Sequence, residues 1–112
     1  MMNLDDLCAL LDGLGIEWAN EDFADDERPT PPYIVLSAGF GETAYADNVA
    51  WVRWMPCEVL LYTAQRSYEI ESKIADALDD AGCAFEKSLT HVDGERLIEA
   101  SFAVNVTEEL GA

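Results

Sequence analysis

The side chains best suited to nucleophilic or metal chemistry are few: Cys8, Cys57, Cys83 and the single histidine, His91. The cysteines lie far apart and form no CxxC pair, so neither a zinc site nor a disulfide framework is indicated. His91 has no serine or cysteine motif beside it, as a histidine-activated nucleophile would need. We therefore expect His91 to have a surface or strand-packing role, and the cysteines to be buried, reduced thiols in a reducing cytoplasm.

Two other segments deserve testing against known chemistry. Gly39-Phe40-Gly41 follows a predicted strand, but it opens no helix and has no lysine behind it, so it matches neither a P-loop nor a dinucleotide motif. The acidic segment 21–27 lacks the ligand spacing of a calcium loop. It remains open as a solvated face, a contact for a basic partner, or a weak attractor of a hard cation. The sequence predicts a non-catalytic protein with no metal and no cofactor.

Charge excludes further classes of function. The chain has 23 Asp and Glu against 6 Lys and Arg, a net charge of −17. Binding to nucleic acid or to an anionic membrane relies on cations, so sequence-specific nucleic-acid binding and membrane association are not expected. No apolar run approaches 18 residues and no signal segment is recognisable. With 112 residues, of which 50% are hydrophobic, we expect one folded, unsecreted domain spanning residues 1–112.

Helix and strand signals alternate along the chain. Residues 3–14 carry an apolar stripe behind the potential N-cap Asn3, which predicts a helix. Prolines in segment 29–32 predict an extended connector into a strand over residues 33–37. Residues 39–48 are rich in glycine and polar residues, and we expect a loop there.

The second half of the chain has clearer signals. Residues 49–63 alternate and are rich in β-branched and aromatic side chains, which predicts a long strand that is bent, bulged or at an edge around Pro56. Ser67 is the expected N-cap of a second helix that stops at Gly82. Strands over 84–92 and 95–107 follow, joined by a tight turn at Asp93-Gly94. The prediction is an α+β fold in the order α-β-β-α-β-β, with a four-stranded, mostly antiparallel sheet and two helices on one face.

Aromatic residues supply the candidates for a contact with another protein. Trp51 and Trp54 fall on opposite faces of a regular strand, so one of them is expected outside a single small core. Core and contact roles both remain open for these tryptophans. The aromatics of the preceding loop favour a contact. The candidate contact residues are Phe40, Tyr45, Asp47, Asn48, Trp51 and Trp54.

The order and spacing of several short segments carry a resemblance over nearly the whole chain. They are Leu14-Gly15-Ile16 with Phe23, Pro31-Pro32-Tyr33-Ile34-Val35, Tyr45-Ala46-Asp47-Asn48, Glu58 to Thr63, Glu69 with Glu71, Phe85-Glu86-Lys87-Ser88, and the strand from Glu95. In this pattern the chain resembles the head-to-tail joining or tail-terminator proteins of long-tailed bacteriophages. It departs from them in its acidity and in placing Trp51, Trp54 and Pro56 on the long strand.

The resemblance implies a structural protein that assembles as a homo-oligomeric ring, usually of six copies, at the end of the tail tube nearest the head. Its implied partners are tail-tube and head-completion proteins, and its implied location is the host cytoplasm during assembly and then the virion. Carboxylates facing a channel would repel passing DNA, which gives the acidity a use. The alternative is an acidic mimic of DNA that inhibits a DNA-binding enzyme.

Overall fold

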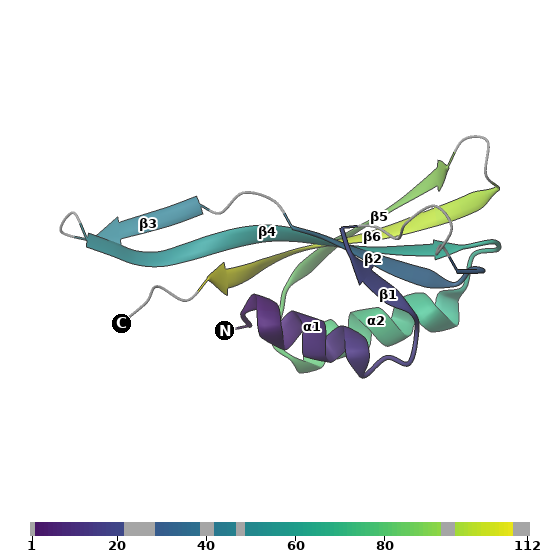
Figure 1. Ribbon diagram of the computed structural model, residues 1–112, viewed down its shortest axis with the longest axis horizontal. Coiled ribbons are helices and arrows are strands. Elements are labelled where there is room, and N and C mark those ends of the chain that lie inside the picture. The colour runs from purple at the N-terminus through teal and green to yellow at the C-terminus, as the bar shows by residue number, and fades with distance from the viewer. Residues whose placement is uncertain (1, 22–28, 39–41, 47–48, 93–95, 109–112) are drawn as a thin grey trace.

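Six strands and two helices are present in the part of the chain that the computed structural model describes, residues 2–21, 29–38, 42–46, 49–92 and 96–108 (Figure 1). For residues 42–46, 49–54 and 108 the structure describes the backbone only. The first helix, α1 (Leu4–Asp12), begins with a reciprocal capping box. The Asn3 side chain accepts from the Asp6 backbone N–H at 2.8 Å, and the Asp6 carboxylate accepts from the Asn3 N–H at 3.2 Å. The predicted cap and helix are therefore confirmed.

The second helix, α2 (Tyr68–Asp80), has the N-cap that the sequence predicts. The Ser67 hydroxyl accepts from the Ile70 backbone N–H at 3.3 Å. The helix gives way to Gly82, whose φ of +73° is unfavourable for other residues. Its buried face comprises Glu71, Ile74 and Leu78, which recur at helical spacing.

The strands form one mixed sheet in the order β1-β2-β4-β6-β5, with β3 pairing separately with β4. Their bounds are β1 (Trp18–Asn20), β2 (Tyr33–Ala38), β3 (Glu42–Ala46), β4 (Val49–Thr63), β5 (Phe85–Val92) and β6 (Leu97–Glu108). Among the pairs of described strands, β1–β2 alone is parallel. Both helices lie on the same face of the sheet, as the sequence predicts (Figure 1). The predicted turn at Asp93-Gly94 lies outside the described residues.

Two features of the predicted topology are wrong. The sheet has six strands rather than four, because β1 and β3 were not expected. Residues 42–46 are a strand and not part of a loop. The first part of β4 has backbone groups to satisfy, and β3 satisfies them by folding back on it from Ala46↔Val49 to Glu42↔Trp54.

Proline 56 occupies a gap in the strand pairing. On one edge, β4 pairs with β6 continuously from Arg53 to Thr63. On the other edge, the pairing with β3 ends at Trp54 and the pairing with β2 begins at Cys57. Among the described residues, Met55 and Pro56 therefore have no strand partner on that side. This local edge is a position where a residue without an N–H is tolerated, in agreement with the prediction for Pro56.

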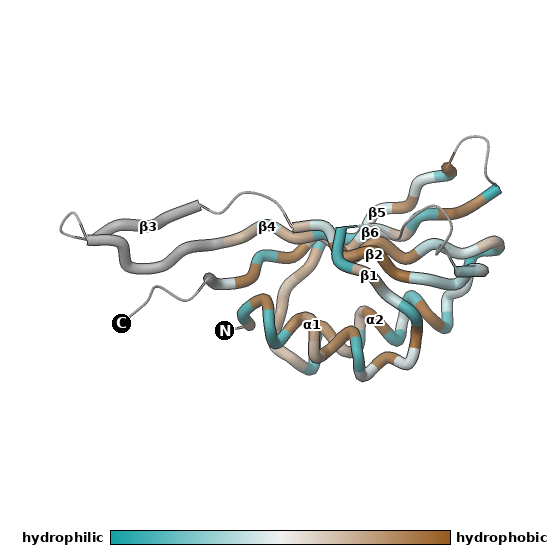
Figure 2. Tube along the Cα trace, viewed as in Figure 1, coloured by the Kyte–Doolittle hydropathy of each residue, from teal (hydrophilic) through white to brown (hydrophobic). Residues whose placement is uncertain are grey.

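The core lies between the helix pair and the sheet. Phe102 at the centre of β6 is fully buried, and Figure 2 shows hydrophobic positions along the strands and along the two helices that lie on one face of the sheet. The same core cluster includes the helix residues Leu7, Leu11, Ile74 and Leu78 and the strand residues Ile34, Leu36, Val59, Leu61, Val104 and Val106. One continuous cluster holds both helices against the sheet, which supports a single domain.

The molecule is longer than a compact domain of its size. Its extents are 51 × 29 × 22 Å and its radius of gyration is 15.2 Å, against about 13 Å for a compact chain of this length. Its accessible surface is 7184 Å², against about 6,100 Å² for a compact protein of this mass. The excess is consistent with the strand pair that extends from one end.

Candidate assembly interface

A two-stranded extension, formed by β3 and residues 49–54 of β4 and here called the arm, is the most distinctive feature of the molecule. In Figure 1 the arm reaches past the ends of both helices along the long axis. It is a direct continuation of β4, whose second half is the central strand of the sheet. The arm extends beyond the body because β4 is one uninterrupted strand of 15 residues, whereas its neighbour β2 spans only six. The body therefore covers part of β4 and leaves the rest to project.

Three of the six candidate contact residues lie on the arm. Tyr45 is in β3, paired in register with Ala50, while Trp51 and Trp54 are in β4. Phe40, Asp47 and Asn48 lie outside the described residues. The loop expected around Tyr45 is a strand, and the backbone of this residue is paired.

The arm carries a β-bulge at Trp51. Ala44 pairs with Val52, but the next residue, Tyr45, pairs with Ala50, so Trp51 is an extra residue opposite the Ala44–Tyr45 step. A bulge bends the strand and increases its twist. The prediction that Trp51 and Trp54 lie on opposite faces assumes a regular strand. Because the strand is bulged at Trp51, that prediction no longer follows from the spacing of the two residues.

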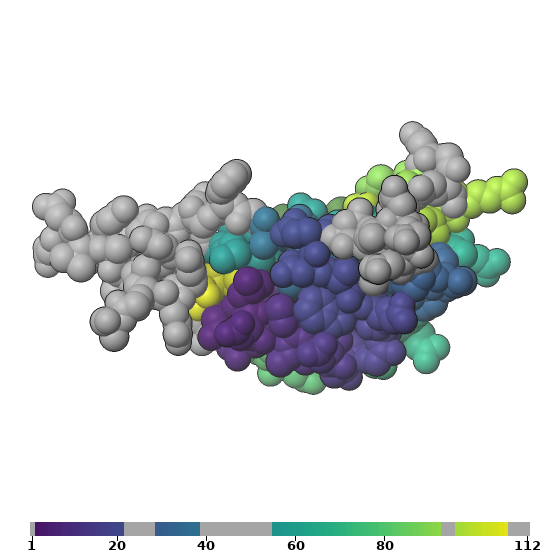
Figure 3. Space-filling model, in the orientation of Figure 1, coloured from purple at the N-terminus to yellow at the C-terminus, as the bar shows by residue number. Residues whose placement is uncertain are grey.

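The base of the arm is tied to the N-terminal segment. Thr107, in register with Trp54, donates its backbone N–H to the Met2 carbonyl at 2.9 Å and its hydroxyl to the same oxygen at 3.3 Å. Asn3 forms a parallel bridge to Thr107, and Met2 is buried in the core. Figure 3 shows this segment lying against the end of β6. The point where β4 leaves the body is thus fixed by three segments from different parts of the chain.

The opposite end of the molecule carries a buried ion-pair cluster. Glu71, only 2% exposed, pairs with both Lys87 of β5 and Arg66, which precedes α2. The Lys87 Nζ is 2.5 Å from the Glu71 Oε1, and the Arg66 Nε donates to Oε2 at 3.4 Å. The Arg66 guanidinium also stacks 4.3 Å from the centre of the exposed Tyr68 ring. The cluster joins the start of α2 to β5.

The cluster keeps Glu71 ionised. Burial raises the pKa of this carboxyl, but the hydrogen bonds and charges of Lys87 and Arg66 outweigh burial, so the pKa lies below its usual value. A buried carboxylate without such partners would be strongly destabilising. Glu71 was expected only as a favourable charge in the first helical turn. Its spacing of three and seven residues from Ile74 and Leu78 is the signal that would have placed it on the buried face.

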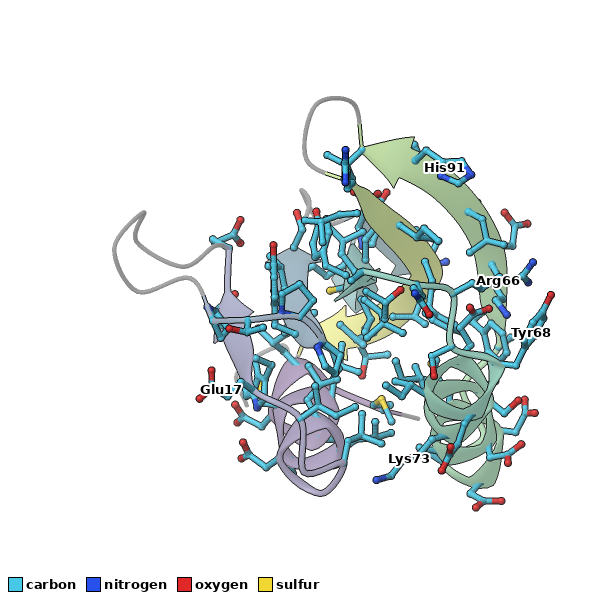
Figure 4. All side chains as sticks on the ribbon, turned by 90° about the vertical axis from the view of Figure 1, so that its right-hand side faces the viewer. Glu17, Arg66, Tyr68, Lys73 and His91 are labelled. Carbon is cyan, nitrogen blue, oxygen red and sulfur yellow. The ribbon has the colours of Figure 1, made fainter. Side chains whose placement is uncertain are left out.

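Three of the six Lys and Arg residues contact polar groups of the protein itself while remaining partly exposed to water. Arg66 and Lys87 pair with Glu71, and the Lys73 Nζ donates to the Leu14 carbonyl at 2.7 Å, linking α2 to the chain after α1. Figure 4 shows the labelled Lys73 between the two helices, at the end away from the sheet. With the total charge at −17, the described surface is therefore dominated by carboxylates.

A shallow groove of about 770 Å³ crosses the sheet near the ends of β2 and β5. Glu58, Ala103 and Glu86 form one cross-strand row there, with Ser37 beside Glu58. The residues of that row and Asn105 line the groove, and His91 is not among them. The groove thus combines two carboxylates with neutral polar and apolar side chains, and its lining includes no histidine that could activate a nucleophile.

The reactive side chains are distributed as follows. All three cysteines are free; Cys57 and Cys83 are buried, and Cys8 is half-buried. Burial raises the pKa of the Cys57 thiol to about 11, with a smaller effect from neighbouring Cys8. His91 is exposed on β5. Within the described segments, no three His, Cys, Asp or Glu side chains come together as a possible metal group.

The chain matches no known protein family, and no curated protein resembles it at a significant level. Neither described helix is long and apolar enough to cross a bilayer.

Proposed function

We propose that this protein is a non-catalytic structural component of a long-tailed bacteriophage or prophage. It forms a ring, of six copies, that terminates the tail tube and joins it to the head. It assembles in the bacterial cytoplasm with tail-tube and head-completion proteins and remains at the head–tail junction of the virion. The single observation that supports this proposal most strongly is the arm, which extends a central strand beyond a small body.

A ring needs heterologous contacts, in which one patch of a subunit meets a different patch of the next. An elongated subunit of 51 × 29 × 22 Å with an extension at one end is suited to such contacts. The acidity is also compatible with this role. A ring around a DNA channel must let phosphates pass, and a carboxylate surface repels them.

The test has one part in vitro and one in infected cells. Purified protein at high concentration, imaged by negative staining and sized by sedimentation, is expected to give ring-shaped particles. Phage lacking the gene are expected to make tails of irregular length that fail to join heads. Tails of normal length joined to heads in the absence of the protein would contradict the proposal. Tight binding to a basic DNA-binding enzyme, lost in high salt, would instead favour the DNA mimic.

A further inference from the structure

Two strand edges in the described chain are free and long enough to pair with another strand. β5 pairs only with β6, and β3 pairs only with β4, so each has one edge without a described partner. The spans are eight residues for β5 and five for β3. β1 is also an edge strand but spans only three residues.

The free edge of β5 lacks the usual protection. Natural edge strands are shielded by proline, lysine, bulges or short length. The segment Ser88-Leu89-Thr90-His91-Val92 has no proline, no glycine and no permanent charge, and its pairing with β6 is regular. Residues 86–91 are all exposed, and Leu89 is 40% exposed. The one lysine of the strand, Lys87, faces α2 and pairs with Glu71. Such an edge is a template for another strand.

The two free edges lie at opposite ends of the molecule. In Figure 1 the arm occupies one end of the long axis, and the second half of β5 reaches toward the other. Each copy can therefore offer one edge and accept another, which is the geometry of a head-to-tail contact. A symmetric β5–β5 contact would leave β3 unpaired and would close as a dimer.

We propose that β3 of one copy adds to the free edge of β5 of a second copy, along residues 88–92, so that the sheets of neighbouring copies become continuous. The inference rests on the proposed ring function and specifies the contact that builds the ring. The five residues of β3 match the five of the unprotected segment. Backbone hydrogen bonds supply the attraction, as in other cases of strand addition.

Cross-linking tests the pairing directly. Copies carrying Thr43→Cys or Ala44→Cys are mixed under oxidising conditions with copies carrying Ser88→Cys or Thr90→Cys, which share one face of β5. At least one mixture is expected to give a disulfide-linked dimer that neither variant gives alone. Ser72→Cys, exposed on α2, is the matched control and should give none with the arm variants. Dimers formed by a β5 variant alone would indicate symmetric pairing and overturn the inference.

Proline substitution tests the same edge without new thiols. N–H groups of an antiparallel edge strand alternate between the partner and the outside, so one of Leu89 and Thr90 directs its N–H outward. Proline at that position is expected to keep the melting temperature of the monomer and weaken association at least about tenfold. The inference would be overturned if both Leu89→Pro and Thr90→Pro form rings as readily as the unmodified protein and no arm–β5 disulfide forms. The ring proposal would then still stand. A chain that never assembles would contradict both.

Discussion

Glu71 shows how a very acidic chain can bury one of its carboxylates. Its two partners are themselves about one-third exposed, with 38% of the Arg66 side chain and 33% of the Lys87 side chain reaching water. The cations therefore keep part of their hydration while the carboxylate gives up its own. This arrangement avoids most of the desolvation cost that makes fully buried ion pairs weak.

Replacing Glu71 with glutamine removes the charge while preserving the shape of the side chain. We expect Glu71→Gln to lower the free energy of unfolding at pH 7 by about 1–3 kcal/mol, because Arg66 and Lys87 lose their counter-charge. Urea denaturation measures the change. Glu69→Gln, exposed in the same first turn, is the matched control and should stay within about 0.5 kcal/mol of the unmodified protein.

The same pair of variants gives a prediction about pH. The pKa of Glu71 in the folded protein lies below that of the unfolded chain, so the folded state binds fewer protons at this site. The stabilisation is complete above the unfolded pKa of about 4.3 and is lost as the pH falls through the lower folded pKa. The difference between the unmodified protein and Glu71→Gln should therefore shrink below about pH 4. A difference that persists there unchanged would contradict the ionised assignment.

Thiol reactivity should separate the three cysteines. With a pKa of about 11, Cys57 is a thiolate in about one molecule per thousand at pH 8, and it is also buried. Alkylation at that pH, followed by mass spectrometry of peptides, is expected to label half-buried Cys8 first and Cys57 last. In denaturant all three should react at similar rates. Labelling of Cys57 ahead of Cys8 in the folded protein would show that the sheet opens more readily than its packing indicates.

At the scale of elements, Lys73 is the polar link between the two helices. Lys73→Met keeps the apolar stem but leaves the Leu14 carbonyl without its donor, and we expect a loss of about 1–2 kcal/mol in unfolding free energy. Lys73→Arg retains a donor and should lose less. Chemical denaturation of both variants measures the effect; equal stability of Lys73→Met and the unmodified protein would show that water replaces the lysine at no cost.

The sequence predicts the long elements well because each has an internal signal. The bounds of β4 agree with the predicted strand, since residues 49–63 are rich in β-branched and aromatic side chains on both sides of Pro56. The start of α2 follows from its cap. By contrast, β1 has three residues and β3 five, and their existence depends on neighbouring strands that need partners. The composition of a short segment does not show whether a neighbouring strand needs a partner. For β3, the preceding glycines instead predict a loop.

The sequence predicts the candidate contact residues but not the structure that carries the three described ones. Tyr45, Trp51 and Trp54 belong to one projecting feature, as a shared contact role requires. The bulge at Trp51 could not be predicted, because it depends on the register between two strands. The free edge of β5 was equally hidden, since whether a strand lies at an edge is a property of the sheet order.

At the scale of the whole molecule, the charge of −17 opposes any assembly of identical copies. Raising the salt concentration from about 0.05 M to about 0.5 M shortens the Debye length from about 14 Å to about 4 Å. We therefore expect association of this chain with itself to strengthen over that range, measured by sedimentation velocity at fixed protein concentration. Binding of a DNA mimic to a basic enzyme would weaken over the same range.

The buried Met2 has a practical consequence for anyone preparing the protein. The Met2 carbonyl accepts a hydrogen bond from the Thr107 backbone N–H. Thr107 pairs with Trp54, the residue at the base of the arm. An affinity tag fused ahead of Met2 would emerge beside that junction and could mask the behaviour under study. Particle formation is best compared before and after proteolytic removal of such a fusion.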